Sequence, residues 1–332
     1  VDFERVRPWK RRRLRDSWIR FGRHAPPRLR REFESFVEAP DQAGWLEDWA
    51  LFASLRTHFG GRPWTEWEEP LRLRRQAALR EAARVLAEAV AFNRYLQFLF
   101  FRQWEALQGE SASRGITLMG DLPFYVALDS ADVWAHPELF RLDGSGRPRR
   151  VAGVPPDYFS RTGQLWGNPL YDWNRLAEQD HAWWVARIRA NLRQVDLLRL
   201  DHFRGFAAFW SVEAASSTAE EGEWAPGPGR ALFEELAAKL GRLPFVAEDL
   251  GLITDEVDAL REGLGLPGMH VLQFGITDAG SRHHPQQHRA NGVVYTGTHD
   301  NDTTRGWFDG LEAAARRSVL GAVAATCPDE VA

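Results

Sequence analysis

Residues 195–205, with the sequence VDLLRLDHFRG, predict a buried strand that ends at charged side chains. Four apolar residues surround Arg199, and the apolar run stops at Asp201 and His202. A short apolar run between polar boundaries is typical of a strand covered on both faces, as in parallel sheets. Ligands bind at the carboxyl ends of such strands, so Arg199 and Asp201 are candidate site residues.

The spacing of these two residues has a chemical consequence. Residues two apart on a strand point to the same face, so the guanidinium of Arg199 can favour the charged form of the Asp201 carboxyl. A purely structural ion pair at the end of a strand would give the same pattern. This segment alone therefore leaves both interpretations open.

The composition narrows the class of protein. With 332 residues, the chain is long enough for one α/β barrel or for two smaller domains. The net charge of −4 gives no electrostatic case for a nucleic acid or an anionic membrane as partner. Cys327 is the only cysteine, as expected in a reducing compartment, and the start of the chain shows no signal-peptide pattern. We therefore expect a cytoplasmic protein without a thiolate metal cluster.

Two regions of the chain differ in their pattern of apolar residues. Residues 1–109 are helical in pattern, and within them residues 71–107 combine strong helix formers with apolar residues at three- and four-residue spacing. Residues 110–332 alternate buried strands with helices. The expected strands lie at 116–126, 195–201, 243–249, 269–276 and 293–302, with helices at 178–194 and 231–240 and long loops at 127–173 and 215–229. This alternation predicts βαβ units and a parallel sheet.

Three of these strands end near a carboxylate, at Asp201, Glu248 and Asp300, which are 47 and 52 residues apart. That separation leaves room for a helix and a loop each, so the three side chains can converge at one end of a barrel. Glycoside cleavage needs two carboxyl groups, one to attack the anomeric carbon and one to protonate the leaving oxygen. Asp201, beside Arg199, suits the charged nucleophile, and Glu248, behind an apolar strand, suits the acid.

A metal hydrolase could use the same residue types, because histidines and carboxylates are common metal ligands. The pattern favours glycoside chemistry over this alternative, since no His-x-His or HExxH motif is present and Arg199 would oppose a cation. The candidate ligands would be Asp121, Asp201, His202, Glu248, Asp249, His299 and Asp300.

The segments LLRLDHFRG, VAEDLG and VVYTGTHDNDT resemble the amylomaltases, which are 4-α-glucanotransferases (disproportionating enzymes) of the retaining α-amylase clan. The likeness extends from DLPFYVALDSADVWAHPELF through VAGVPPDYFSRTGQLWGNPLYDW to THDNDTTRGWF. The resemblance implies an α/β fold, a (β/α)8 TIM barrel truncated at both ends, with about strands 3 to 7 present. Residues 1–109 would then be a helical insertion subdomain, and residues 110–332 the catalytic barrel portion with its active-site loops.

The resemblance also implies roles for single residues. Asp201 would be the nucleophile, Glu248 the acid/base and Asp300 the third carboxylate, which orders the sugar hydroxyls. Trp224 would lie on a flexible loop that covers the bound glucan, and residues 283–291 depart from the usual family segment. The implied substrate-binding residues are Arg199, His299, Asp121, Trp224, Trp166 and Asn168.

The implied reaction moves α-1,4-glucan segments between maltodextrins through a covalent glycosyl ester on Asp201, without a cofactor or a metal. The preference for a glucan acceptor over water comes from the resemblance alone. A hydrolase of the same clan and a catalytically inactive glucan-binding fragment therefore remain as alternatives.

Overall fold

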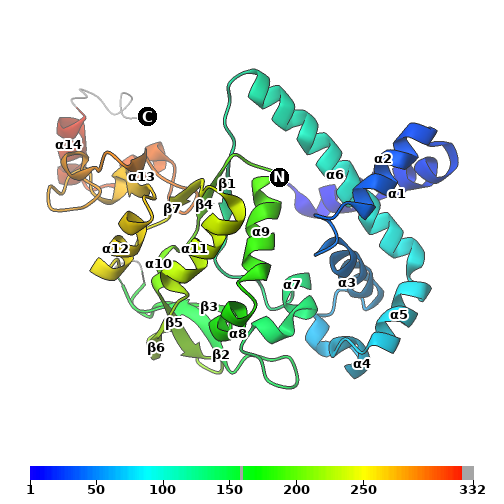
Figure 1. The fold of residues 1–332 in the computed structure, drawn as a ribbon. Coiled ribbons are helices and arrows are strands. Elements are labelled where there is room, and N and C mark those ends of the chain that lie inside the picture. Colours follow the sequence, from blue (N-terminus) through cyan, green and yellow to red (C-terminus); the bar gives the residue numbers. More distant parts are fainter. Residues whose placement is uncertain (158–159, 324–332) are drawn as a thin grey trace.

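The computed structural model describes residues 1–157 and 160–323 and has a parallel strand that overlaps each of the five expected segments (Figure 1). The first three form one sheet in the order β1-β4-β7, and the last two form a second parallel pair. Their bounds are Met119–Leu122 (β1), Leu197–Leu200 (β4), Phe245–Ala247 (β7), Gly268–Val271 (β8) and Gly292–Tyr295 (β9). The α/β class expected from the sequence is confirmed.

The two parallel sheets are connected by one backbone hydrogen bond and by one side chain. The backbone N–H of Ala247 donates to the carbonyl of Pro267 at 2.8 Å, and the N–H of Met269 donates to Oδ1 of Asp249 at 2.7 Å. The Asp249 carboxylate is buried and also lies 3.0 Å from the guanidinium of Arg282. Asp249 therefore takes the place of a backbone acceptor between β7 and β8, which is a structural role.

A four-stranded antiparallel sheet with the order β3-β2-β5-β6 lies beyond the parallel strands. Its strands are Arg150–Val154 (β2), Gln164–Pro169 (β3), Ala208–Glu213 (β5) and Gly222–Pro226 (β6). Two of these strands fall in the loop-rich segment 127–173 and one in segment 215–229, so the expectation that 215–229 is a loop is wrong. β6 is glycine- and proline-containing, yet it pairs with β5 residue by residue, with Trp224 opposite Trp210.

The N-terminal helices lie on one side of the molecule and the strands on the other (Figure 1). The helical pattern at 71–107 corresponds to three helices, which are separated near Arg74, with φ of +54°, and at Leu86. A separate aromatic cluster that includes Phe21 and Tyr95 packs α1 against α6. The six helices are Phe3–His24 (α1), Pro27–Glu38 (α2), Leu46–His58 (α3), Glu69–Arg72 (α4), Gln76–Val85 (α5) and Ala87–Ser113 (α6).

The main core lies between the parallel strands and the helices that connect them. Trp184 of α9 and Leu236 of α11 are fully buried and pack in the same cluster as Leu198 and Phe245 of the sheet. The remaining helices are Ala131–Ala135 (α7), Trp173–Glu178 (α8), Ala182–Leu192 (α9), Arg204–Ala207 (α10), Gly229–Leu240 (α11), Asp255–Gly263 (α12), Thr304–Gly310 (α13) and Ala313–Ala322 (α14), with 3-10 turns at Trp64–Glu66, Pro137–Leu139, Leu272–Phe274 and Pro285–Gln287. No helix of the described residues has the length and apolar character needed to cross a membrane.

Candidate active site

Arg199 joins the ends of two neighbouring strands. It lies opposite Asp121 in the parallel register of β1 and β4, and its Nη1 is 2.8 Å from both carboxyl oxygens of Asp121. The same nitrogen lies 3.0 Å from Oδ1 of Asp201. The Arg199 side chain is buried, whereas those of Asp121 and Asp201 are 45% and 40% exposed. One guanidinium therefore holds two carboxylates that remain open to a ligand.

Asp201 is subject to opposing influences. Burial raises the pKa of its carboxyl, the guanidinium of Arg199 lowers it, and the negative charges of Asp121 and Asp300 raise it again. Arg199 thus favours the charged form of Asp201, as expected, but the net direction of the pKa is upward. Desolvation and two like charges outweigh one shared cation.

Glu248 follows β7 directly and is buried. Desolvation and the neighbouring charge of Asp201 raise the pKa of its carboxyl to about 8, although two backbone N–H groups oppose this shift. These donors are the N–H of His202, 2.8 Å from Oε2, and the N–H of Leu250, 2.9 Å from Oε1. Glu248 therefore holds a proton near neutral pH. A raised pKa is also what the apolar strand before Glu248 predicted.

The backbone of His202 adopts a left-handed conformation, with φ of +49°, where its N–H reaches Glu248. Its ring packs 4.9 Å from that of Trp166 and 6.0 Å from that of Phe124. Desolvation lowers the pKa of His202 to about 4, with a smaller contribution from Arg204, so the ring is uncharged at neutral pH. His202 thus acts on the site through its backbone and its ring faces.

Asp300 and His299 follow β9 and are the most open of the candidate residues. Both side chains are 69% exposed, and Nε2 of His299 lies 3.5 Å from Oδ1 of Asp300. The charge of Asp300 nevertheless acts on the pKa of Asp201. The third carboxylate therefore lies at the same end of the strands as the other two.

Trp166 and Trp224 lie on the two opposite edge strands of the antiparallel sheet, β3 and β6. Each has a partly exposed indole, at 38% and 39%. Trp224 is part of the strand β6 and not of a loop, and the guanidinium carbon of Arg204 lies 3.7 Å from its ring centroid. Asn168 donates its amide to the carbonyl of Val126 at 3.0 Å and so supports the loop after β1.

The described residues include no group of three or more His, Cys, Asp or Glu side chains placed to hold a metal ion. Asp121 and Asp201 face the cation of Arg199, and Asp249 faces Arg261 and Arg282. The ligand set proposed for a metal hydrolase is thus not assembled in this part of the chain.

A carboxylate held by an arginine beside a second, protonated carboxyl provides the two groups that glycosidic-bond chemistry uses. Residues 1–331 match the family model described as 4-alpha-glucanotransferase. The chain belongs to this family. A 4-alpha-glucanotransferase from Thermus thermophilus is 51% identical over 311 residues, which cover 93% of this chain and 62% of that protein. One from Synechocystis sp. is 44% identical over 335 residues, covering 100% and 66%.

Two solved structures of amylomaltases are similar in fold. The enzyme from Streptococcus agalactiae, in complex with acarbose, matches with a TM-score of 0.92 and 36% identity over 98% of this chain and 66% of its own. The enzyme from Corynebacterium glutamicum matches with a TM-score of 0.73, 24% identity and coverage of 97% and 42%. The chain thus spans less than two thirds of the length of the 4-alpha-glucanotransferases just compared.

The sequence alone did not identify two residues that contribute to the candidate site. The backbone of His202 has no side-chain signature, although histidine is among the residues that tolerate positive φ. Arg204 is buried beside Trp224 and could have been noticed only as a charged residue within the motif DHFRG.

Proposed function

We propose that the protein is a retaining 4-α-glucanotransferase, which cleaves an α-1,4-glucan and passes the released segment to the 4-hydroxyl of another glucan. The observation that carries this proposal is the pair of Asp201 and Glu248. One carboxyl contacts Arg199, and the other is buried with a pKa raised to about 8. Membership of the family supports a glucan, and not water, as the acceptor. Nothing in the two carboxyl groups themselves distinguishes a sugar hydroxyl from water.

In the first step, a carboxylate oxygen of Asp201 attacks the anomeric carbon while Glu248 gives its proton to the departing glycosidic oxygen. The glycosidic bond breaks, and a glycosyl ester on Asp201 forms. In the second step, the Glu248 carboxylate takes the proton of an incoming 4-hydroxyl, whose oxygen attacks the anomeric carbon and releases Asp201. The cycle restores both groups and requires no cofactor.

The remaining candidates would bind the sugar. Asp300 and His299 are exposed at the strand ends, where they could accept and donate hydrogen bonds to ring hydroxyls. Arg199 would hold Asp201 and Asp121 in position. The exposed faces of Trp166 and Trp224 suit stacking on pyranose rings, and Asn168 would support the groove through Val126.

We also propose that the five parallel strands are part of a (β/α)8 barrel. The parallel orders β1-β4-β7 and β8-β9 and the similarity to the Streptococcus agalactiae amylomaltase support this fold. Residues 1–109 would be a helical insertion subdomain, and residues 110–332 the catalytic portion. The single cysteine supports a cytoplasmic location.

The proposed reaction is tested by incubating the whole protein with maltotriose and separating the products. Glucose together with a ladder of longer dextrins is expected, because each transfer lengthens one acceptor. Glucose and maltose without longer products would indicate a hydrolase. Binding of maltotriose without any product would indicate a non-catalytic glucan-binding protein.

A further inference from the structure

The side chain of Arg204 is a cation that the fold buries without a carboxylate partner. Arg204 is 8% exposed and forms no ion pair with the described residues, and its Nε is buried without a hydrogen-bond partner among them. Desolvation lowers the pKa of its guanidinium, and Glu256 of α12 is the acidic group that opposes this shift. Because a buried charge without a counter-charge is unfavourable, the contacts that Arg204 does form have to compensate for it.

The first of these contacts is with Trp224. The guanidinium carbon of Arg204 lies 3.7 Å from the ring centroid, so the cation rests on the face of the indole. Trp210 of β5 meets the same indole at 63°, with ring centroids 5.1 Å apart. β6 is an edge strand of its sheet in the described part of the chain, so strands support Trp224 from one side only. Arg204 and Trp210 therefore fix the orientation of this indole.

The second contact is with the segment that follows the proposed acid. Nη1 of Arg204 donates to the carbonyl of Leu252. Residues 250–253 form no backbone–backbone hydrogen bond with the rest of the described chain. The other hydrogen bond of this segment runs from the N–H of Leu250 to Oε1 of Glu248, at 2.9 Å. Two side chains, those of Arg204 and Glu248, thus supply the hydrogen bonds that hold residues 250–253.

The backbone just before Arg204 contacts the same carboxyl group. The N–H of His202 donates to Oε2 of Glu248 at 2.8 Å, and the N–H of Leu250 donates to Oε1. Residues 201–204 therefore contribute the proposed nucleophile, one of the two donors to the proposed acid, and the side chain that holds the segment of the other donor.

We propose that Arg204 is a positioning residue, which holds the indole of Trp224 and the segment that donates to Glu248 in one fixed arrangement. This inference rests on the proposed function, in which a sugar ring stacks on Trp224 and Glu248 protonates the leaving oxygen. A glucan bound at Trp224 then meets the acid at a fixed distance. Arg204 acts through these two groups and not by contact with the reacting atoms.

The first measurement is hydrogen–deuterium exchange of the whole protein without glucan. Arg204→Lys keeps the charge but lacks the flat guanidinium that stacks and donates. We expect the amides of residues 222–226 and 249–254 to exchange about 2- to 10-fold faster than in the wild type, as for the loss of one hydrogen bond or stacking contact. Unchanged exchange in either segment would overturn the inference, whether or not the protein transfers glucan.

The second measurement is the pH dependence of kcat/KM for maltodextrins. Burial and the charge of Asp201 raise the pKa of Glu248 to about 8. Arg199 and the backbone N–H of Leu250 lower it. Because a looser segment weakens the bond from Leu250, the alkaline limb should move upward by about 0.5 to 1 pH unit in Arg204→Lys.

Arg204→Gln should shift the alkaline limb equally, since the effect comes from position and not from the charge of Arg204. This variant also keeps the test valid if Arg204→Lys fails to fold. An unchanged alkaline limb in both variants would overturn the inference.

The third measurement separates the two contacts of Arg204. Arg204→Lys should raise the KM for maltodextrins about 2- to 10-fold in the wild-type background. In the background of Trp224→Ala it should raise the KM no further, because the indole that Arg204 orients is absent. Independent effects of the two substitutions on KM would mean that Arg204 does not act through Trp224 and would overturn the inference.

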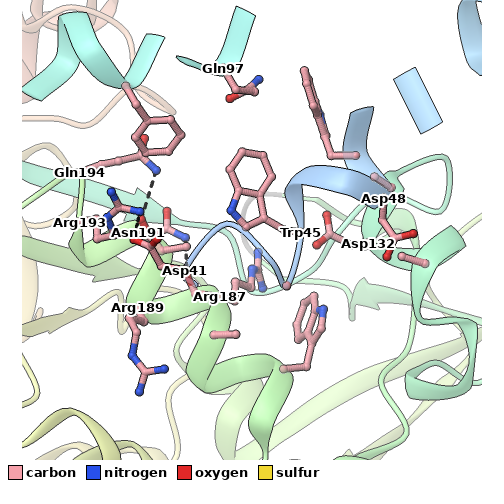
Figure 2. A pocket seen from close by; sticks show the side chains of 18 of the residues that line it. Asp41, Trp45, Asp48, Gln97, Asp132, Arg187, Arg189, Asn191, Arg193 and Gln194 are labelled. Atoms are coloured by element: carbon pink, nitrogen blue, oxygen red, sulfur yellow. Dashed lines mark hydrogen bonds and ion pairs between the residues drawn. The ribbon is translucent and has the colours of Figure 1, made fainter. Parts of the chain in front are cut away.

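The matched control is Arg187→Lys. The guanidinium carbon of Arg187 lies 4.9 Å from the ring of Trp184, and its Nη2 donates to the carbonyl of Pro123 at 2.7 Å. Arg187 lies on the wall of a separate cavity between α3, α6, α7 and α9 (Figure 2), and its hydrogen bonds do not reach β6 or residues 250–253. Arg187→Lys should therefore lower the stability without moving the alkaline limb. An equal shift in this control and in Arg204→Lys would indicate general loosening and overturn the inference.

Failure of the proposed function would be recognised separately. Wild-type protein that forms no longer dextrins from maltotriose would overturn that function, and the exchange of residues 222–226 and 249–254 in Arg204→Lys would still decide the positioning role. Active wild-type protein with unchanged exchange in Arg204→Lys would overturn the positioning role alone.

Discussion

The backbone N–H of His202 lies 2.8 Å from Oε2 of Glu248 and connects the end of β4 to the end of β7. Because His202 directly follows Asp201, the residue after the proposed nucleophile fixes the position of the proposed acid. The link depends on the left-handed backbone of His202. This hydrogen bond joins the motif DHFRG to the motif VAEDLG, although 46 residues separate the two bonded residues.

Replacing the proposed nucleophile should abolish transfer without unfolding the protein. Asp201→Asn removes the attacking charge, so we expect kcat on maltotriose to fall by about 10³-fold or more. The side chain is 40% exposed, so the free energy of unfolding should change little. Asp16→Asn, at an exposed position of α1, is the control and should retain full activity. An unchanged rate in Asp201→Asn would refute the assignment.

The protonation of Glu248 should set the alkaline side of the pH profile. With a pKa of about 8, the group is protonated below this pH and loses its proton above it. We therefore expect kcat/KM for maltodextrins to decrease as the pH rises through about 8, measured from pH 5 to 10.

Glu248→Gln should slow the reaction of maltodextrins about 10²- to 10⁴-fold, because their leaving oxygen needs a proton. Formation of the glycosyl ester from α-maltosyl fluoride should be much less affected, since fluoride leaves without protonation. Release of fluoride in a single turnover is the measurement. An equal loss with both donors would mean that Glu248 is not the acid.

His202 should make the protein less stable in acid. Its folded-state pKa of about 4 lies below the unfolded value of 6.5, so its contribution to stability is present above pH 6.5 and is lost as the pH falls toward 4. Between pH 7.5 and 5 we expect this loss to be about 2 kcal/mol. Urea unfolding at pH 7.5, 6 and 5 measures it.

His202→Asn is the comparison, because asparagine tolerates a positive φ but does not titrate. The variant should be less stable than the wild type at pH 7.5, because it lacks the packing of the imidazole ring. Its free energy of unfolding should decrease less than that of the wild type between pH 7.5 and 5. An identical decrease in both proteins would assign the effect to other groups, of which His283, with a pKa also lowered to about 4, is one.

Trp224 should contribute to substrate binding as a fixed surface. One face contacts Arg204 and an edge contacts Trp210, while 39% of the residue is exposed. Trp224→Ala should raise the KM for maltodextrins about 2- to 10-fold with a smaller change in kcat, as expected for the loss of one stacking contact. Trp224→Phe should restore most of the affinity. A fall in kcat alone would argue for a different role.

The antiparallel sheet shows where reasoning from the sequence failed. Segments 127–173 and 215–229 are rich in glycine, proline and charged residues, which favours loops. β2 and β6 nevertheless form on the two sides of β5, because cross-strand pairing depends on partners distant in the chain. The position of Trp224 opposite Trp210 could not be read from either segment alone.

What the sequence by itself determined is local. The apolar runs that end at Asp201 and Glu248 identify two buried strands and place a carboxyl group at the end of each, because strand burial and side-chain alternation depend on neighbouring residues. The motifs in these segments were sufficient to predict the family to which the chain belongs.

Only the tertiary structure determined how the pKa values and contacts of these carboxyl groups differ. The contact of Arg199 with Asp121 joins positions 78 residues apart and depends on the register of β1 and β4. The raised pKa values of Asp201 and Glu248 follow from the exclusion of water and from charges contributed by other strands. Desolvation and long-range charge are properties of the assembled fold, so no single segment of the sequence contains them.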